Sequence, residues 1–153
     1  MTQELLFRDM EISDLKAVSR GDALVEETPW TQEGFADVLR EGWDSVVGEI
    51  DGEIVSWGVI RDIMGESELL TIGVMPNYQR RGIGEATLRV LLDKMKEKGV
   101  SHCFLEVRES NLRARRLYQK LGFKSCGRRR DYYRLGDGHE DAIVMQLTWK
   151  SDQ

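Results

Sequence analysis

The segment Gln79-Arg80-Arg81-Gly82-Ile83-Gly84 combines two closely spaced glycines with two arginines. Residues without a Cβ let a backbone come close to a ligand, and the first turn of a following helix offers unpaired N–H groups to an anion. The arginines can add positive charge at the rim of such a site, although paired surface arginines are also common where they meet only solvent. The pattern predicts a phosphate-binding turn.

Two other phosphate-binding motifs fit this segment less well. A P-loop requires Gly-Lys-Ser/Thr after its glycines, and none follows here. The dinucleotide fingerprint finds its first two glycines and, at Glu106, an acid at a suitable distance, but Thr87 stands at the third glycine position. Moreover, the residues from Asn77 to Arg81 separate Pro76 from Gly82, whereas that fingerprint turns tightly out of its strand. Both observations disfavour a dinucleotide site.

Glu106 and Tyr118 are side chains that could move protons. Glu106 lies in an apolar segment, where strand alternation puts it on one face with Phe104 and Arg108. An acid at this place fits either a general base or an ion pair with a neighbouring arginine. Tyr118 lies on the apolar stripe of a helical segment, which fits an aromatic side chain of the core. If its ring is buried while its hydroxyl reaches solvent, Tyr118 could also donate a proton.

Hydrophobic periodicity divides the chain into the elements that would position these residues. Strands are expected at 4–10, 44–51, 53–63, 67–75, 100–108, 123–135 and 140–149, with a polar connection at 136–139. Helices are expected at 13–24, 31–42, 82–99 and 111–122. This order predicts a mixed α/β sheet with helices packed on it.

Local signals mark several of these boundaries. Ser13 or Asp14 would cap the first helix, and Thr31 would cap the second, which Gly42 would end. The Asp51–Gly52 pair predicts a tight hairpin between two strands.

Composition limits the class of protein. The 153 residues suit one domain, 1–153, and 41% hydrophobic with 32% charged residues is typical of a globular chain. A net charge of -5 argues against non-specific nucleic-acid binding but is compatible with the binding of a basic peptide.

The N-terminus resembles no signal peptide and no segment is long and apolar enough to cross a bilayer, so we expect a cytoplasmic protein that binds no membrane. Cys103 and Cys126 show no metal-ligand spacing and are expected to be free core residues.

The glycine turn resembles the pyrophosphate loop of the GCN5-related N-acetyltransferases (GNAT), whose pattern is Gln/Arg-x-x-Gly-x-Gly/Ala. The segments 69–88, 104–123 and 130–147 follow in the order and spacing of that family. Together they resemble its bacterial ribosomal-protein-alanine N-acetyltransferase branch, and the N-terminal half matches in layout, including Pro29-Trp30. The resemblance implies a mixed, mostly antiparallel central sheet of about seven strands flanked by about four helices.

The resemblance also implies the site and its cosubstrate, acetyl-CoA. Glu106 would be the proton acceptor and Tyr118 the general acid. Acetyl-CoA would contact Ile72, Gly73, Val74, Arg80, Arg81, Gly82, Ile83, Gly84, Glu85 and Asn111. Asn111 would also cap the helix that carries Tyr118. A bulge, which Gly73 permits, would splay its strand from that of Glu106 and free an N–H for the acetyl carbonyl.

The acceptor implied by the resemblance is the N-terminal α-amine, starting with alanine, of a small-subunit ribosomal protein. It would lie between the loop 25–30 and the hairpin 131–142, with Tyr132 and Tyr133 as walls. The acids of these stretches suit a basic peptide or are ordinary solvated loop residues: Glu26, Glu27, Asp131, Asp137, Glu140 and Asp141. We expect direct attack without an acyl-enzyme, no metal, no nucleic-acid partner, and a monomer or weak oligomer.

Two alternatives share the cofactor loop. One is an acetyltransferase for a lysine side chain or a small amine, which only the walls of the acceptor site would distinguish. The other is a regulatory module that binds acetyl-CoA without catalysis, which the presence of both Glu106 and Tyr118 disfavours.

Overall fold

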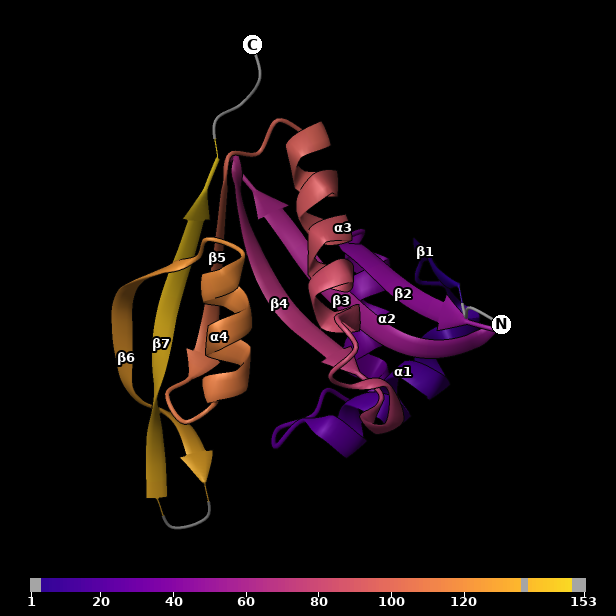
Figure 1. The fold of residues 1–153 in the computed structure, drawn as a ribbon, viewed down its shortest axis with the longest axis horizontal. Coiled ribbons are helices and arrows are strands. Elements are labelled where there is room, and N and C mark those ends of the chain that lie inside the picture. Colours follow the sequence, from indigo (N-terminus) through magenta and orange to yellow (C-terminus); the bar gives the residue numbers. More distant parts are fainter. Residues whose placement is uncertain (1–3, 136–137, 150–153) are drawn as a thin grey trace.

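The computed structural model describes residues 4–135 and 138–149. Its strands are β1 (Leu5–Asp9), β2 (Asp44–Ile50), β3 (Glu53–Ile63), β4 (Glu66–Val74), β5 (His102–Arg108), β6 (Lys124–Leu135) and β7 (Gly138–Thr148). Its helices are α1 (Leu15–Val25), α2 (Gln32–Glu41), α3 (Ile83–Glu97) and α4 (Leu112–Lys120), with short 3-10 turns η1 (Ile12–Asp14) and η2 (Pro76–Tyr78). The predicted order of elements and the mixed, mostly antiparallel sheet are confirmed (Figure 1).

The sheet opens at its centre. The strand order is β1-β2-β3-β4-β5-β7-β6, and every neighbouring pair is antiparallel except β4 with β5. That parallel pairing joins Ser67 with Cys103 and Glu68 with Phe104, after which the strands diverge, as Figure 1 shows. A register shift against β3 leaves Leu70 of β4 without a partner. The expected bulge is therefore present, at Leu70 rather than at Gly73, and bulges bend a strand away from its neighbour.

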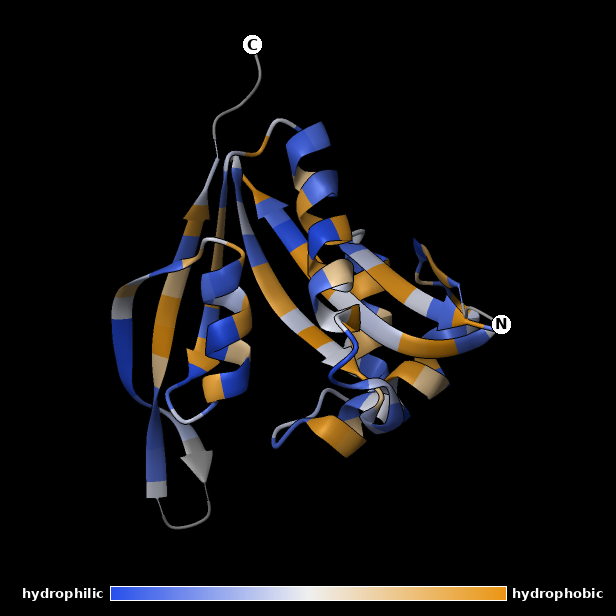
Figure 2. Ribbon diagram, viewed as in Figure 1, coloured by the Kyte–Doolittle hydropathy of each residue, from blue (hydrophilic) through white to orange (hydrophobic). Residues whose placement is uncertain are grey.

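Helices cover both faces of the sheet. On one face Leu88 and Leu91 of α3 and Tyr118 of α4 share an apolar cluster with strand residues such as Leu105. On the other face Phe35 of α2 packs in a cluster with α1 and with alternate strand residues. Figure 2 shows the apolar residues running along the central strands while the outer surfaces of α3 and α4 are polar. Burial of these stripes is the main force that holds the opened sheet together.

Most predicted boundaries hold. Thr31 Oγ1 accepts a hydrogen bond from Gly34 N at 3.0 Å, and Gly42 ends α2 in the left-handed conformation with φ of 73°. Asp51 and Gly52 both have positive φ, as the predicted two-residue hairpin requires. Asn111 Oδ1 accepts from Ala114 N at 3.1 Å and so caps α4.

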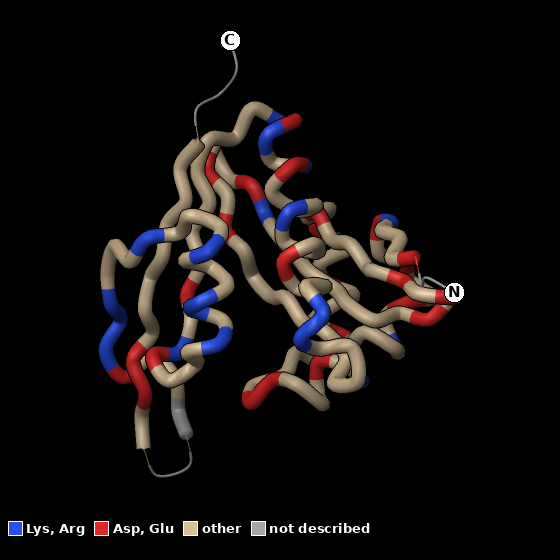
Figure 3. The backbone as a smooth tube through the Cα atoms, in the orientation of Figure 1, with Lys and Arg blue, Asp and Glu red and all other residues tan. Residues whose placement is uncertain are grey.

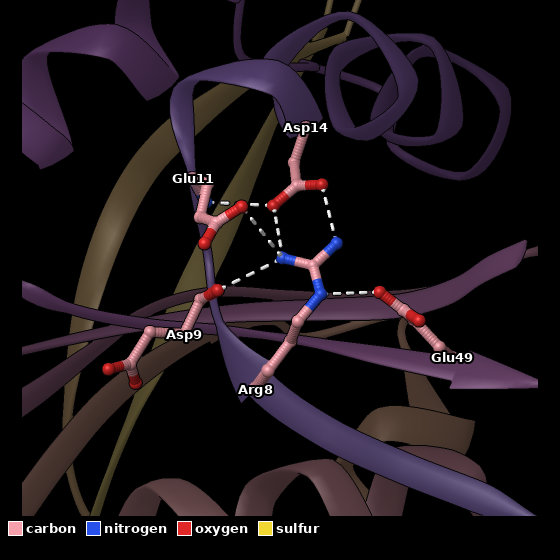
Figure 4. A network of polar contacts seen from close by, with 5 residues as sticks. All are labelled: Arg8, Asp9, Glu11, Asp14 and Glu49. Carbon is pink, nitrogen blue, oxygen red and sulfur yellow. Dashed lines mark hydrogen bonds and ion pairs between the residues drawn. The ribbon is translucent and has the colours of Figure 1, made fainter. Parts of the chain in front are cut away.

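The cap prediction for α1 is wrong. Asp14 has helical dihedrals and makes no side-chain cap hydrogen bond. Its carboxylate instead receives two hydrogen bonds of 2.7 Å from Arg8, whose Nε also binds Glu49 of β2 (Figure 4). This bidentate pairing holds the pKa of Asp14 below its usual value, against the opposing effect of burial. Asp14 also accepts a hydrogen bond from Glu11 N at 2.7 Å in a capping box on η1. It thus ties β1 to the η1 turn that precedes α1 and is not the N-terminal cap of α1 itself.

The last hairpin is more irregular than predicted. Arg129 pairs with Ala142 and Tyr133 with Glu140, so three residues of β6 oppose one of β7, and Asp131 among them has φ of 52°. The predicted connection at 136–139 is shorter in the structure because Gly138 and His139 already belong to β7. Asp137 lies outside the described residues.

The cysteine prediction is half right. Both thiols are free and Cys103 is buried, but Cys126 is exposed. It lies on the edge strand β6 at a register shift, where Ser125 and Gly127 are paired with β7 and the residue between them is not. Within the described ranges no helix has the length and apolarity to span a membrane, and no cluster of His, Cys, Asp or Glu could hold a metal ion.

Candidate active site

Two cavities meet at the opening between β4 and β5. The larger, of about 740 Å³, lies between the α1–α2 loop and the β6–β7 hairpin, and we call it the acceptor cavity. The smaller, of about 360 Å³, lies between the glycine turn and α4, and we call it the cofactor cavity. Residues that line both are Val25, Glu26, Ile72, Asn111 and Tyr118. Two ligands that occupied the two cavities would therefore meet next to Tyr118 and Ile72.

Tyr118 lies at this junction and is also part of the core. It is 7% exposed, and its ring packs edge-on against Phe123 with centroids 5.8 Å apart. Burial raises the pKa of its hydroxyl above the usual value, and the nearby Glu26 carboxylate adds to the rise. The hydroxyl is protonated at neutral pH, as that of an ordinary tyrosine is, and so has a proton to donate. Both sequence interpretations of Tyr118 are compatible with this position.

Glu106 lies within β5 and lines the acceptor cavity. Its side chain is 17% exposed, and Arg129 Nε lies 2.9 Å from its Oε1. The predicted alternation is confirmed, because Cys103, Leu105 and Val107 are buried on the opposite face of the strand. The ion pair expected as an alternative is present, yet the carboxylate still faces the cavity.

The glycine turn presents its backbone to the cofactor cavity. Arg80 and Gly82 both adopt positive φ, of 66° and 78°, and Gly82 is the N-cap of α3. No side chain caps this helix, so its first N–H groups point toward the space in front of the turn. A short run of such donors at a helix N-terminus suits a pyrophosphate.

Side chains around the turn fix its place, and sequence reasoning missed them. Gln79 Nε2 donates to the Val74 carbonyl oxygen at 3.1 Å, and Gln79 Oε1 accepts from Arg113 Nη1 at 3.0 Å. The turn is thereby tied to both β4 and α4. The guanidinium of Arg81 stacks over the Tyr78 ring at 5.0 Å and, unlike the other predicted cofactor contacts, is not among the residues that line the cavity. The first position of the motif is the signal that could have predicted the role of Gln79.

The remaining predicted cofactor residues all line the cofactor cavity, together with further residues of α4, two of them cationic. The group comprises Ile72, Gly73, Val74, Arg80, Gly82, Ile83, Gly84, Glu85 and Asn111. The side chain of Glu85 binds Lys120 at 2.7 Å, so this residue offers the cavity its backbone while its carboxylate is occupied. Arg113 and Lys120 also line the cavity, and Figure 3 shows positive residues gathered along α4. They add positive charge near the proposed phosphate position.

Gly73 is needed for packing under the cofactor cavity. A Cβ at this position would lie 2.3 Å from Cζ2 of Trp57, and one at Gly21 would lie 2.6 Å from Cη2 of the same ring. The Trp57 Nε1 donates to Asp22 Oδ1 at 3.0 Å, and Asp22 Oδ2 accepts from Trp30 N at 2.8 Å. The buried indole and carboxylate thus fix the α1–α2 loop against β3. This loop carries Glu26 and Glu27 to the acceptor cavity.

The acceptor cavity has aromatic and charged walls. The predicted Tyr132 and Tyr133 both line it, with ring centroids 5.1 Å apart. Of the predicted acids, Glu26 and Glu27 line it, and so does Glu68, which the sequence analysis did not select. Three of the predicted acids are not among the residues that line it. They are Asp131, Glu140 and Asp141. Glu140 accepts a hydrogen bond from Ser110 N at 2.6 Å, and Asp141 accepts one from Arg128 Nη1 at 2.7 Å.

The buried thiol near the site is a poor nucleophile. Desolvation raises the pKa of Cys103 to about 11, so the thiolate is scarce at neutral pH. Cys103 is absent from the residues that line either cavity within the described chain. Both facts favour direct transfer over a route through an acyl-cysteine.

An opened mixed sheet with a glycine turn at the N-terminus of α3 defines the class of acetyl-CoA-dependent acyltransferases. The chain belongs to the acetyltransferase (GNAT) family, whose model matches residues 11–123. It is 36% identical over 138 residues to the ribosomal protein bS18-alanine N-acetyltransferase of Escherichia coli (strain K12), covering 90% of this chain and 93% of that relative.

Solved structures agree with this assignment. The crystal structure of the ribosomal-protein-S18-alanine N-acetyltransferase from Escherichia coli superposes with a TM-score of 0.89 at 34% identity, covering 95% of this chain and 94% of that one. Arabidopsis thaliana NAA60 in complex with acetyl-CoA superposes with a TM-score of 0.86 at 20% identity, covering 95% of this chain and 98% of that one. The second likeness concerns the fold alone.

Proposed function

We propose that this chain transfers the acetyl group of acetyl-CoA to the N-terminal α-amine of a small-subunit ribosomal protein that begins with alanine. The observation that carries the proposal is the meeting of the two cavities at Tyr118, with Glu106 facing the acceptor side. The relatives named for alanine N-acetylation, which this chain matches over most of its length, support the choice of acceptor.

Two parts of acetyl-CoA, its pyrophosphate and its pantetheine arm, match features of the cofactor cavity. The N–H groups at Gly82, Ile83 and Gly84 would bind the pyrophosphate, and the edge of β4 at Ile72–Val74 would lie along the pantetheine arm. When bound, acetyl-CoA supplies an activated thioester carbonyl. Because β4 has left β5 at this point, its free N–H groups can donate to the carbonyl oxygen as an oxyanion hole does.

The acceptor amine needs only weak base catalysis. An α-amine has a pKa near 8, so roughly one molecule in ten is neutral at pH 7, and deprotonation costs about 1.4 kcal/mol. Glu106, directly or through a water molecule, takes the proton as the amine attacks. Tyr118, whose hydroxyl lies at the junction of the two cavities and is protonated at neutral pH, donates its proton to the departing thiolate.

Glu26, Glu27, Glu68 and Glu106 around the acceptor cavity would favour basic residues after the first alanine. We place the reaction in the cytoplasm, where ribosomal proteins are made. An acetyltransferase acting on lysine would share the cofactor cavity, so the acceptor must be tested directly.

The test is mass spectrometry of the purified protein with acetyl-CoA and three peptides. The first begins with a free alanine followed by basic residues, the second is N-terminally blocked with an internal lysine, and the third begins with a residue other than alanine. Acetylation confined to the free alanine is the expected result. Acetylation only at lysine would overturn the proposed acceptor, and acetyl-CoA binding without transfer to any peptide would favour a regulatory module.

A further inference from the structure

Arg108 is a buried cation in the wall of the acceptor cavity. It ends β5, two residues after Glu106 and on the same face of the strand, and it lines the cavity. The residue is only 8% exposed. A guanidinium carries five N–H donors, and a buried donor without a partner is costly. The partners of Arg108 therefore need to be accounted for.

The hydrogen bonds of Arg108 are incomplete. Its Nη2 donates to Thr28 Oγ1 at 3.2 Å, and its guanidinium lies 4.1 Å from the centroid of the Tyr133 ring. Its Nη1 is buried and has no hydrogen-bond partner among the described residues. The nearest carboxylate to Nη1 is Glu27, at 3.8 Å, which is too long for a hydrogen bond.

The charge of Arg108, in contrast, is already balanced. Glu27 lies within ion-pair distance of Nη1, at 3.8 Å. A ligand carboxylate at Nη1 would meet the repulsion of the Glu27 carboxylate, whereas a neutral carbonyl oxygen would not. The group missing at Nη1 is therefore a neutral hydrogen-bond acceptor.

From this geometry we infer that Arg108 determines acceptor specificity by donating a hydrogen bond from Nη1 to a backbone carbonyl oxygen in the first two residues of the acceptor peptide. The inference rests on the proposed function. The Glu27 side chain, 3.8 Å from Nη1, is 62% exposed and can move when a peptide enters.

Strand geometry agrees with this placement. Two residues along β5 span roughly 6.6 Å, and an extended peptide advances about 3.3 Å per residue. A peptide that runs along β5 from an amine at Glu106 toward Arg108 places its first or second carbonyl level with Arg108. A lysine side chain would present methylene groups at this level, so the contact selects an α-amine over an ε-amine.

The test combines a change in the protein with a change in the peptide. The peptide begins with alanine, and thioamides, which are weaker hydrogen-bond acceptors, replace its first two amides one at a time. For the unaltered protein, one of the thioamides is expected to lower kcat/KM by roughly tenfold or more, the size of a hydrogen bond from a charged group. In Arg108→Met and Arg108→Lys the same thioamide is expected to change kcat/KM by less than about twofold, since the bond is already lost or weakened.

Two controls separate a lost contact from a damaged protein. Arg61→Gln removes a positive charge from the same cavity wall, where Arg61 binds Glu68 at 2.8 Å, and should keep the full sensitivity to the thioamide. Acetyl-CoA affinity and thermal melting report whether each variant is folded, and Arg108→Lys retains the charge should Arg108→Met fail to fold.

The outcomes distinguish this inference from the proposed function. Equal thioamide sensitivity in the unaltered protein and in both Arg108 variants would overturn the inference while leaving the proposed function intact. Insensitivity of the unaltered protein to both thioamides would do the same. Failure of the unaltered protein to acetylate the alanine peptide would overturn the proposed function, and the inference with it.

Discussion

Arg129 reaches across β7 to place its Nε 2.9 Å from the carboxylate of Glu106 on β5. On β7, Ala142 pairs in register with both Arg129 and Arg108, while Val144 pairs with Glu106, so the ion pair runs diagonally across β7. The Arg129 side chain is 57% exposed, so the pair contributes little to stability. We attribute its value to orienting the carboxylate toward the acceptor cavity.

Glu106→Gln tests that carboxylate as proton acceptor. The amide keeps the shape of the side chain but cannot accept a proton, so kcat/KM for the alanine peptide should fall by about 100-fold or more. The loss should be greatest below pH 7, where most of the amine is protonated. Steady-state rates between pH 6 and 9 measure both effects.

The matched control is Glu109→Gln. Glu109 pairs with Arg128 at 3.0 Å and does not line the cavity in the described chain, so its rate should change by less than about twofold. If Glu106→Gln retained the rate of this control at every pH, Glu106 would be only the partner of Arg129.

Tyr118→Phe separates proton donation from packing. The substitution keeps the ring that packs on Phe123 and removes only the hydroxyl at the junction of the two cavities. We expect kcat to fall at least about tenfold, while the Kd for acetyl-CoA, measured by calorimetry, stays within about twofold. A folded variant that had lost acetyl-CoA binding would contradict the role of general acid.

Two glycines near the cofactor cavity should respond to alanine in opposite ways. In Gly73→Ala the new methyl group would overlap the Trp57 ring, and such overpacking costs about 1–3 kcal/mol of unfolding free energy. In Gly84→Ala the nearest atoms are 3.6 Å and 3.7 Å away, which is ordinary contact, and alanine favours the helix by about 0.5 kcal/mol.

Urea unfolding of both variants measures these differences. Gly73→Ala should unfold at a lower urea concentration than the unaltered protein, and Gly84→Ala at the same or a slightly higher one. A destabilised Gly84→Ala would mean that the start of α3 requires glycine for its own conformation, not only for a ligand to approach.

Features set by neighbouring residues were predictable from the sequence. The Thr31 and Asn111 caps and the Asp51–Gly52 hairpin depend on a few residues around them, and all are confirmed. The position of Glu106 on the cavity face followed from alternation along β5. Asp14 shows the limit of such rules, because its cap was replaced by a bidentate pairing with Arg8 from another element.

Features that depend on contacts between distant segments were not predictable. Alternation placed Arg108 beside Glu106, but no local pattern indicates that Tyr133 stacks on its guanidinium or that Thr28 binds it. The sequence also gives no signal for the bulge of β6 that precedes Tyr133. The residue with positive φ there is Asp131, whereas glycine usually occupies such a position. The acceptor side was therefore the less predictable half of the site, while the cofactor turn was marked by its glycines.

Glu26 should make stability depend on pH near neutrality. Desolvation at the junction of the two cavities raises its pKa to about 7, the Asp22 and Glu27 carboxylates add to the rise, and the Arg108 charge opposes it. In the unfolded chain the pKa is near the ordinary glutamate value, about 4.3. A carboxyl group whose pKa is higher in the folded state favours folding when protonated, so its contribution is fully present below about pH 4, declines between pH 4 and 7, and is lost above pH 7.

Glu26→Gln removes this dependence. The neutral amide resembles the protonated acid, so the variant should be more stable than the unaltered protein at pH 8 and nearly equal to it at pH 4.5. Because Glu26 is exposed to solvent, which screens its charge, the gain should be much smaller than the full pKa shift would give. Thermal melting of Glu26→Gln and of the unaltered protein at several pH values between these limits measures it. An offset in Tm that stayed constant across this range would show that Glu26 acts through packing and not through its charge.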